Sequence, residues 1–307
     1  MFISSLLVSY IPMNIGVLRF FRKTISILDI CKTHLTIILL GNISGFVTGA
    51  KLLNESNLSS NSKNPSTKSL ILSSNAGIGF VISFVGLSLW NNIQFGIFLY
   101  FLQIAISLFL NCFVFFKPKN SYSLTKTEPY QKGAFISSFV NSVSSSTNTI
   151  ITVCSYTIIF SLLANIFVHI LNISVDSVFS AIIFSLFDIT QGLKASIMLE
   201  NNILSAFFTG FAIGFGGISV AFQIFSTSTN LIFSKKKYIF SKLMQGIICG
   251  VFSSLYVNIF KISPSENAES CFSFGNTFSI YVGVIFILLC FFRIKKYFKS
   301  ILLSKKC

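Results

Sequence analysis

A carboxylate stands inside an apolar stretch of this chain, where charged side chains are rare. Asp188 lies in the run VFSAIIFSLFDITQGLKASIM, and it alone of the eight acidic residues falls inside a segment of membrane-like hydropathy. Holding a carboxylate at that depth costs about 2.5–3.5 kcal/mol on insertion scales. We therefore expect Asp188 to bind a ligand or a cation, or to hold the shape of the segment around it.

Other polar side chains could complete a binding site with this carboxylate. Hydroxyl and amide groups at membrane depth are functional candidates by default. Amides offer paired donors and acceptors of the kind that recognise nucleobase-like or amide-like ligands. The predicted ligand-binding residues are Thr48, Asn75, Asp188, Thr190, Gln191 and Gln223.

Three of these residues, and two lysines beside them, also have structural explanations, which the sequence leaves open. Asp188 could pair with Lys194 or cap a broken helix, and Asn75 could satisfy an open carbonyl at a helix break. Gln223 could join two helices, a contact worth only about 1 kcal/mol. Lys51 and Lys194 could extend to the membrane interface.

Motifs of catalysis and metal binding are missing from the sequence. No GxSxG, HExxH, P-loop or GxGxxG in its usual context occurs. The seven cysteines form no CxxC pair, and neither His34 nor His169 has a Ser, Cys or acidic partner at useful spacing. We predict a protein that is not an enzyme and that carries no metal ion or cofactor.

The composition is that of a membrane protein. Mean hydropathy is +0.79, and only 10% of residues are charged, against about 25% in ordinary soluble domains. The net charge of +15 comes from short basic clusters between apolar runs, which argues against a nucleic-acid partner. Seven runs are long enough to cross a bilayer, namely 2–18, 70–90, 93–116, 149–171, 203–233, 239–260 and 274–292.

Two further apolar segments, 35–50 and 178–198, are interrupted by polar residues and glycine. Irregular backbone at membrane depth survives only where protein or water surrounds it, so we interpret both segments as re-entrant helical hairpins. With these hairpins and an external N-terminus, almost all of the 23 basic residues fall in cytoplasmic loops. Lys242 is counted here with the cytoplasmic cluster that follows residue 233.

The order of spans and hairpins repeats along the chain. Residues 1–116 form a first repeat of span, hairpin, span and span, and residues 149–260 form a second in the opposite orientation. A cytoplasmic loop and an interfacial amphipathic helix join them at 117–148, and 261–307 add an outer loop, a last span and a basic cytoplasmic tail. The predicted fold is an all-α integral membrane protein with about seven spanning helices and two hairpins in an inverted repeat.

Four stretches, in this order, resemble one family of membrane proteins. The chain is similar to the sporulation integral membrane proteins of the YlbJ type, within the nucleoside-recognition or Gate-domain group. The resemblance implies a transporter-like fold in the cell membrane of a spore-forming bacterium, and a nucleoside-like solute. The matching stretches are 45–52 (GFVTGAKL), 73–86 (SSNAGIGFVISFVG), 186–195 (LFDITQGLKA) and 212–225 (AIGFGGISVAFQIF).

The leading hypothesis is a multi-pass transporter-like protein that acts in sporulation. It would bind or move a small polar solute between the two hairpins, with the lipid bilayer and a coupling cation as further partners. The alternative is a membrane structural or assembly factor needed for spore formation, which transports nothing. The sequence leaves the solute, the coupling ion and the oligomeric state open.

The predicted topology determines which cysteines face the medium. Cys271 is expected outside the cell and Cys307 inside. A membrane-impermeant maleimide applied to intact cells should label Cys271 and leave Cys307 unmodified until lysis, with a Cys271→Ser variant as the control. Labelling of Cys307 in intact cells would overturn the orientation.

Overall fold

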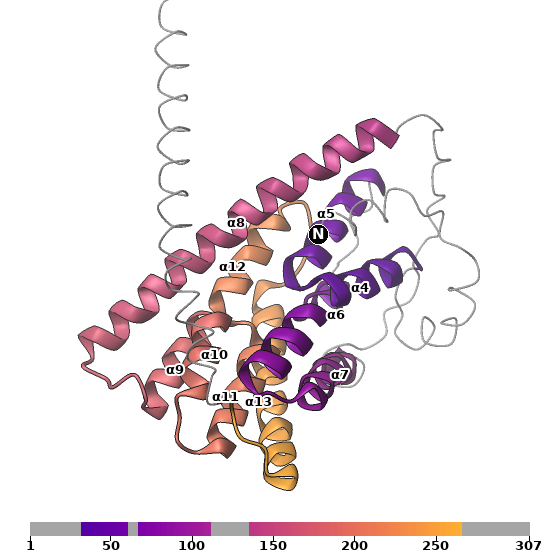
Figure 1. Ribbon diagram of the computed structural model, residues 1–307. Helices are drawn as coiled ribbons and strands as arrows, with labels where there is room; N and C mark the ends of the chain where they lie inside the picture. The colour runs from indigo at the N-terminus through magenta and orange to yellow at the C-terminus, as the bar shows by residue number, and fades with distance from the viewer. Residues whose placement is uncertain (1–31, 61–66, 112–134, 266–307) are drawn as a thin grey trace, which may run out of the picture. The chain divides into compact units, whose positions relative to one another are not determined.

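Helices account for all the regular secondary structure in the described part of the chain. The computed structural model describes residues 32–60, 67–111 and 135–265, and no strand occurs in these ranges. All but the last of these residues belong to one compact unit, Met1–Pro264. The helices (Figure 1) are α4 (Lys32–Ser44), α5 (Phe46–Ser60), α6 (Thr67–Ser73), η1 (Phe80–Leu89), α7 (Ile93–Phe109), α8 (Phe135–Ile170), α9 (Val178–Phe187), α10 (Ile189–Ile197), α11 (Asn202–Phe215), α12 (Gly217–Thr227) and α13 (Lys235–Phe260).

Three helical stretches in the described ranges are long and apolar enough to cross a membrane. They are Val143–Ile170, Asn202–Thr227 and Lys235–Phe260. Shorter apolar helices, among them η1 and α7, occupy parts of other predicted spans. The predicted spans 2–18 and 274–292 lie outside the described residues, so the total of seven spans stays a prediction.

The longest helix, α8, exposes apolar side chains along much of its length. Ile159, Leu162 and Ile166 are each more than half exposed. In the most apolar 18-residue stretch of this helix, only 6% is buried inside the protein. Exposed apolar surface on this scale marks contact with a membrane or a partner. In a chain this apolar, we interpret it as the lipid-facing surface.

The same helix runs through the segment that was predicted to be a separate interfacial helix. The sequence predicts that the interfacial helix ends by residue 148 and that a span begins at 149, whereas α8 is continuous from Phe135 to Ile170. Hydroxyl groups around the expected boundary bond within the helix: Thr147 donates to the Val143 carbonyl and Thr149 to the Ser145 carbonyl. These polar side chains therefore satisfy themselves without a break in the backbone.

The first hairpin turns at Gly45. This residue joins α4 to α5 with a φ of +108°, which residues other than glycine rarely adopt. Gly41 and Gly49, four residues to either side, lie so close that a Cβ on Gly41 would stand 3.0 Å from the Gly49 Cα. Because residues at equal distance from the turn are in contact, α4 and α5 fold back along each other.

The second hairpin turns at Asp188. This residue is extended, with φ −147° and ψ 138°, and separates α9 from α10. A Cβ on Gly192 would stand 2.6 Å from the Ser185 Cα, so these two helices also fold back along each other. The polar run around Asp188 thus ends one helix and begins the next.

The helix that follows each hairpin is interrupted. Residues 74–77 separate α6 from the helix that contains η1, and Gly216 and Gly217, with φ of +79° and +82°, separate α11 from α12. The sequence predicts spans at 70–90 and 203–233, and it leaves a helix break at Asn75 open as an alternative. The difference arises because the polar and glycine residues at these places leave the helical path, and tertiary contacts satisfy the backbone there.

Each hairpin turn lies against the break of the helix that follows it. A Cβ on Gly45 would stand 3.4 Å from the Gly77 nitrogen, and a Cβ on Gly217 would stand 3.0 Å from the Asp188 Cα. The non-helical backbone of each half is therefore gathered at one junction between a turn and a break.

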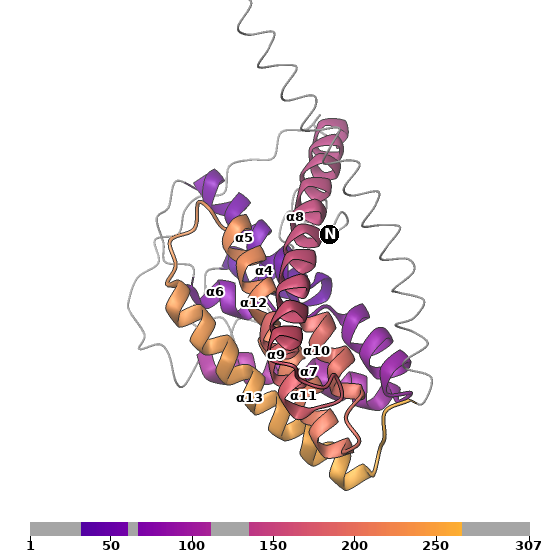
Figure 2. The same cartoon turned by 90° about the vertical axis from the view of Figure 1, so that its left-hand side faces the viewer.

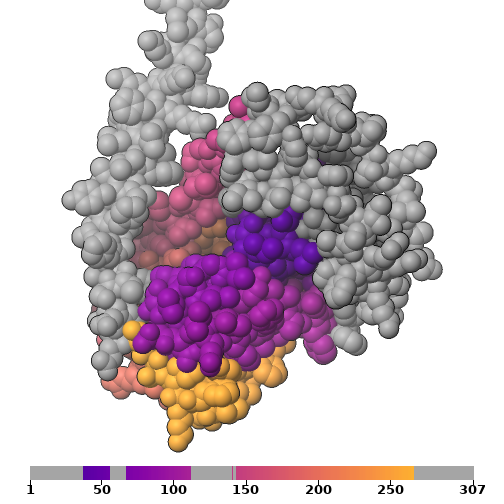
Figure 3. Space-filling model, turned by 45° about the vertical axis from the view of Figure 1, so that its right-hand side comes forward, coloured from indigo at the N-terminus to yellow at the C-terminus, as the bar shows by residue number. Residues whose placement is uncertain are grey.

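Contacts between distant segments hold the two halves together. A Cβ on Gly216 would stand 3.1 Å from the Phe46 ring, which places the first hairpin turn at the second break. The buried Trp90 indole donates to the Thr209 hydroxyl at 3.3 Å. In the space-filling view, the purple surface of residues 67–111, to which α6 and α7 belong, borders the yellow surface of α13 (Figure 3).

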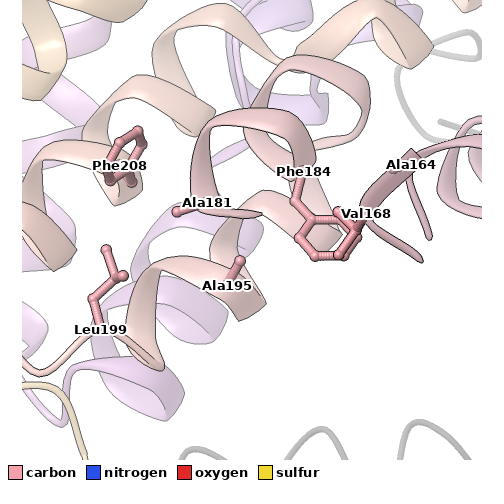
Figure 4. Close-up of a cluster of buried hydrophobic side chains, with 7 residues drawn as sticks. All are labelled: Ala164, Val168, Ala181, Phe184, Ala195, Leu199 and Phe208. Carbon is pink, nitrogen blue, oxygen red and sulfur yellow. The ribbon is translucent and has the colours of Figure 1, made fainter. Parts of the chain in front are cut away.

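The second half packs around small residues. Helices α11 and α13 lie side by side (Figures 1 and 2), where a Cβ on Gly214 would stand 2.8 Å from the Gly246 Cα. Close backbone approach of this kind is typical of helix pairs in membranes. An apolar cluster joins α8, the α9–α10 hairpin and α11 through Ala164, Val168, Ala181, Phe184, Ala195, Leu199 and Phe208 (Figure 4).

The first hairpin is expected to tolerate no side chain at Gly49. A Cβ there would overlap the backbone oxygen and side chain of Ser73, so Gly49→Ala should lower the free energy of unfolding by about 1–3 kcal/mol. Gly79→Ala is the matched control, because nothing lies within 4 Å of its Cβ position. Thermal unfolding of both variants in detergent checks this, and equal midpoints would contradict the close packing.

Candidate functional site

Asn75, in the first break, is the centre of a buried polar network. Its Nδ2 donates to Asn42 Oδ1 at 2.8 Å. Its Oδ1 accepts from Lys242 Nζ and from Gln245 Nε2, both at 2.9 Å. All four side chains are buried, so one amide joins the first hairpin, the broken helix and α13.

Amide side chains also satisfy the backbone that the break leaves open. Gln103 of α7 accepts from the Ala76 N–H at 3.1 Å and donates to the Ala76 carbonyl at 2.9 Å. Asn42 and Asn75 donate to the Leu72 carbonyl near the end of α6. The explanation of Asn75 as a group that satisfies a carbonyl at a helix break therefore accounts for part of its role.

Lys242 is buried, whereas the sequence predicts it in a cytoplasmic loop. It was counted with a cytoplasmic cluster, but it lies inside α13, 1% exposed. Its ammonium donates to Asn75 Oδ1 and, at 3.0 Å, to Gln245 Oε1, and these neutral oxygens replace part of its hydration. A signal was present, since Lys242 falls within the predicted span 239–260 and three residues before Gln245, on the same helix face.

The second hairpin turn holds Asp188 with one carboxylate oxygen engaged and the other open. Oδ2 accepts from the N–H groups of Thr190 at 3.0 Å and Gln191 at 3.4 Å, and from the Thr190 hydroxyl. Asp188 is therefore the N-cap of α10. Oδ1 is buried and makes no hydrogen bond of normal geometry among the described residues, although the Ser219 hydroxyl lies close to the carboxylate. Capping therefore accounts for one oxygen only.

Gln223 is occupied by contacts between helices. Its amide nitrogen donates to the hydroxyls of Thr157 and Ser219, both at 3.1 Å, and to the Val153 carbonyl at 3.4 Å. The bonds to Thr157 and Val153 connect α12 to α8. The explanation of Gln223 as a link between helices thus has direct support.

Two polar groups on α5 are buried and make no hydrogen bond within the described residues. Thr48 is 2% exposed and Lys51 is 7% exposed. Neither Thr48 Oγ1 nor Lys51 Nζ has a hydrogen-bond partner within the described ranges. They lie one turn apart on one face of the helix, so α5 presents a hydroxyl and an ammonium together.

The predicted residues thus fall into two groups rather than one. Asp188, Thr190 and Gln191 meet at the second hairpin turn, while Asn75 lies at the first break. Within the described residues, no hydrogen bond joins Asn75 to Asp188. Sequence reasoning missed Gln103, Gln245 and Lys242 as members of the first group.

The chemistry of these groups is that of binding. They offer a carboxylate, ammonium groups, amides and hydroxyls, all of which can hold a polar solute or a cation. Within the part of the chain that the structure describes, no cluster of three or more His, Cys, Asp or Glu side chains could hold a metal ion.

The network around Asn75 makes a stability prediction. Asn75→Leu would leave the Lys242 ammonium buried with fewer acceptors, so it should lower the free energy of unfolding by about 3–5 kcal/mol. Adding Lys242→Met removes the buried charge and should recover much of that loss. Thermal unfolding of both single variants and the double variant checks this, and strictly additive effects would contradict the coupling.

Comparison with known proteins adds no family name to this geometry. The chain matches no protein-family model, no curated protein and no solved structure. The resemblance to the YlbJ-type membrane proteins therefore stays a prediction that rests on four stretches of sequence.

Proposed function

We propose that this chain is a transporter-like membrane protein that binds or moves a small polar solute between two helical hairpins. The observation that carries this proposal is Asp188 Oδ1, a buried and unpartnered carboxylate oxygen where a hairpin turn meets a broken helix. A buried polar atom that makes no hydrogen bond costs about 1–3 kcal/mol, and more when its group is charged. A fold that keeps such a group is expected to use it, and a donor group of the solute or a coupling cation would supply the partner.

Thr48 and Lys51 support a site at the junction of the halves. Both lie on α5 shortly after Phe46, and the Phe46 ring contacts the second break at Gly216. The Cα–Cβ bonds of a helix tilt toward its N-terminus, which in α5 is the hairpin turn. The Thr48 hydroxyl therefore leans toward the region that also contains the Asp188 turn, whereas the Lys51 ammonium has the Glu55 carboxylate as a charged neighbour.

We further propose that the hairpins and broken helices belong to an inverted repeat in the membrane. In both halves a hairpin precedes a broken helix, and the hairpin turn lies on the break. Broken helices near mid-membrane offer open N–H and C=O groups that can hold solutes and ions. In this proposal both hairpins are re-entrant and about seven spans cross the cell membrane.

The class of solute and the biological role come from the resemblance. It suggests a nucleoside-like solute, a role in sporulation and a cation that couples transport. A membrane structural factor that transports nothing is the alternative. That alternative gives no use to an open carboxylate oxygen at Asp188, and for this reason we favour transport.

Replacing Asp188 tests the proposal. Asp188→Asn removes the charge but keeps an oxygen that can cap α10. Uptake of nucleosides, amino acids or small acids into proteoliposomes should fall by about tenfold or more, the size expected for loss of a charge-assisted hydrogen bond, with the protein present in equal amount. Asp176→Asn, in an exposed loop, is the matched control.

Three results would count against this reading of Asp188. If the wild-type protein carries none of these solutes, the structural alternative gains. If Asp188→Asn is fully active, Asp188 is not part of the site. If that variant is degraded while Asp176→Asn is stable, Asp188 serves the fold.

A further inference from the structure

Polar side chains from three helices face one another along a seam that leads away from the Asp188 turn. Helix α12 packs against both α5 and α8 (Figures 1 and 2). Gln223 of α12 donates to the Thr157 hydroxyl of α8 at 3.1 Å. The Asn54 amide oxygen of α5 accepts from the Asn230 N–H, just beyond α12, at 2.9 Å. The polar seam consists of Thr48, Lys51, Glu55, Ser146, Gln223 and Ser228.

One side of α5 carries a polar residue at every turn. Thr48, Lys51 and Glu55 are three and four residues apart, so they line one side of the helix. That side faces α8, because the Ser145 hydroxyl of α8 donates to Glu55 Oε1 at 3.2 Å. Glu55 is exposed, whereas Thr48 and Lys51 are buried. Polar groups on α5 therefore continue from the surface inward toward the hairpin turn.

The side of α8 that faces the seam is polar as well. Ser145 and Thr157 both bond to the other helices. At about 100° per residue these two lie about 120° apart around α8, and Ser146 lies between them. Ser146 and Thr149 are buried, although most of this helix exposes apolar side chains. The hydroxyl groups thus mark the side of α8 that the protein covers.

Four buried polar atoms of the seam make no hydrogen bond within the described residues. They are Thr48 Oγ1, Lys51 Nζ, Ser146 Oγ and Ser228 Oγ, and their side chains are between 2% and 7% exposed. Buried polar groups are normally bonded, and leaving one unbonded costs about 1–3 kcal/mol. Such groups at α5, at α8 and at the end of α12 indicate a surface built to meet a polar ligand.

Two fixed points give the seam its direction. At the outer end, exposed Glu55 bonds to Ser145. At the inner end, Gln223 donates to the Ser219 hydroxyl at 3.1 Å, and this hydroxyl lies close to the Asp188 carboxylate. The polar groups therefore form a series that runs from the surface to the Asp188 turn.

We propose that the polar seam is the access route by which a small polar solute reaches the Asp188 turn from the face where α5 and α12 end. The predicted topology places this face in the cytoplasm. The inference rests on the proposed function, because it names the path to that site. A solute moving along the seam could bond to one polar group after another, which avoids the cost of leaving its own polar groups among apolar side chains.

The route is closed in this structure, because its inner groups are buried. Opening it requires α8 to move away from α5 and α12. Only 6% of the most apolar stretch of α8 is buried inside the protein, so this helix has little packing to lose when it moves. Helix α8 is therefore the movable wall of the route.

Cysteine labelling in nanodiscs tests the route without a need for transport. Thr48→Cys, Ser146→Cys and Ser228→Cys would each be made in the full-length chain with its seven native cysteines replaced by serine. A membrane-impermeant methanethiosulfonate reaches both faces of a nanodisc. Each new thiol should react at least about tenfold faster than Ser241→Cys, because labelling follows the fraction of molecules in which a buried site is open.

Ser241 is the matched control because its environment is similar but lies outside the seam. Its hydroxyl belongs to α13, is buried, and makes no hydrogen bond among the described residues. A second measurement connects the seam to uptake: modification of Ser228→Cys should remove most of the solute uptake into proteoliposomes, and the same treatment of Ser241→Cys should have no effect.

The results separate the route from the proposed function. If the three seam thiols react no faster than Ser241→Cys, the route is refuted, even where the wild-type protein takes up solute. Full uptake by modified Ser228→Cys would also refute it. If the seam thiols react faster but the wild-type protein transports nothing, the access route stands and the transport proposal fails. The three positions belong to separate elements, so a variant that does not fold leaves two others to decide.

Discussion

The backbone at the two helix breaks must find hydrogen-bond partners within the protein, and the rest of the structure follows from that need. In a bilayer no water reaches an open N–H or C=O group, and each such group costs several kcal/mol. At the first break Gln103 bonds both groups of Ala76, and Asn42 and Asn75 cover the Leu72 carbonyl. The turn of a hairpin then closes over the break at Gly77.

Each junction of a hairpin turn and a helix break contains one buried ionisable side chain, and the two side chains are of opposite charge type. The first has a buried ammonium, Lys242, whose partners are the amide oxygens of Asn75 and Gln245. The second has a buried carboxylate, Asp188, of which one oxygen caps α10 and the other is unpartnered in the described chain. A buried network whose oxygens all accept hydrogen bonds helps to specify the fold. A buried oxygen without a hydrogen bond can instead accept one from a ligand. This difference is why the functional proposal rests on Asp188 rather than on Asn75.

Close packing is the second constraint on both junctions. The turns can reach the breaks because Gly45, Gly77 and Gly217 carry no side chain. The absence of a side chain at Gly214 and Gly246 likewise lets α11 approach α13 closely. Without a hydrophobic force between helices in lipid, such contacts and the polar bonds between them supply much of the association. The polar groups at the two junctions are therefore held in place by packing as well as by hydrogen bonds.

The sequence by itself determined the class of protein, the existence of helices and the places where polar residues and glycines interrupt apolar runs. Those features are local, because hydropathy and glycine act on the few residues around them. It did not reveal that the predicted span 203–233 is broken, or that Lys242 is buried against Asn75, 167 residues away. Only the tertiary structure decided these, since a lysine is buried, or a break tolerated, according to which distant oxygens and N–H groups fold against it.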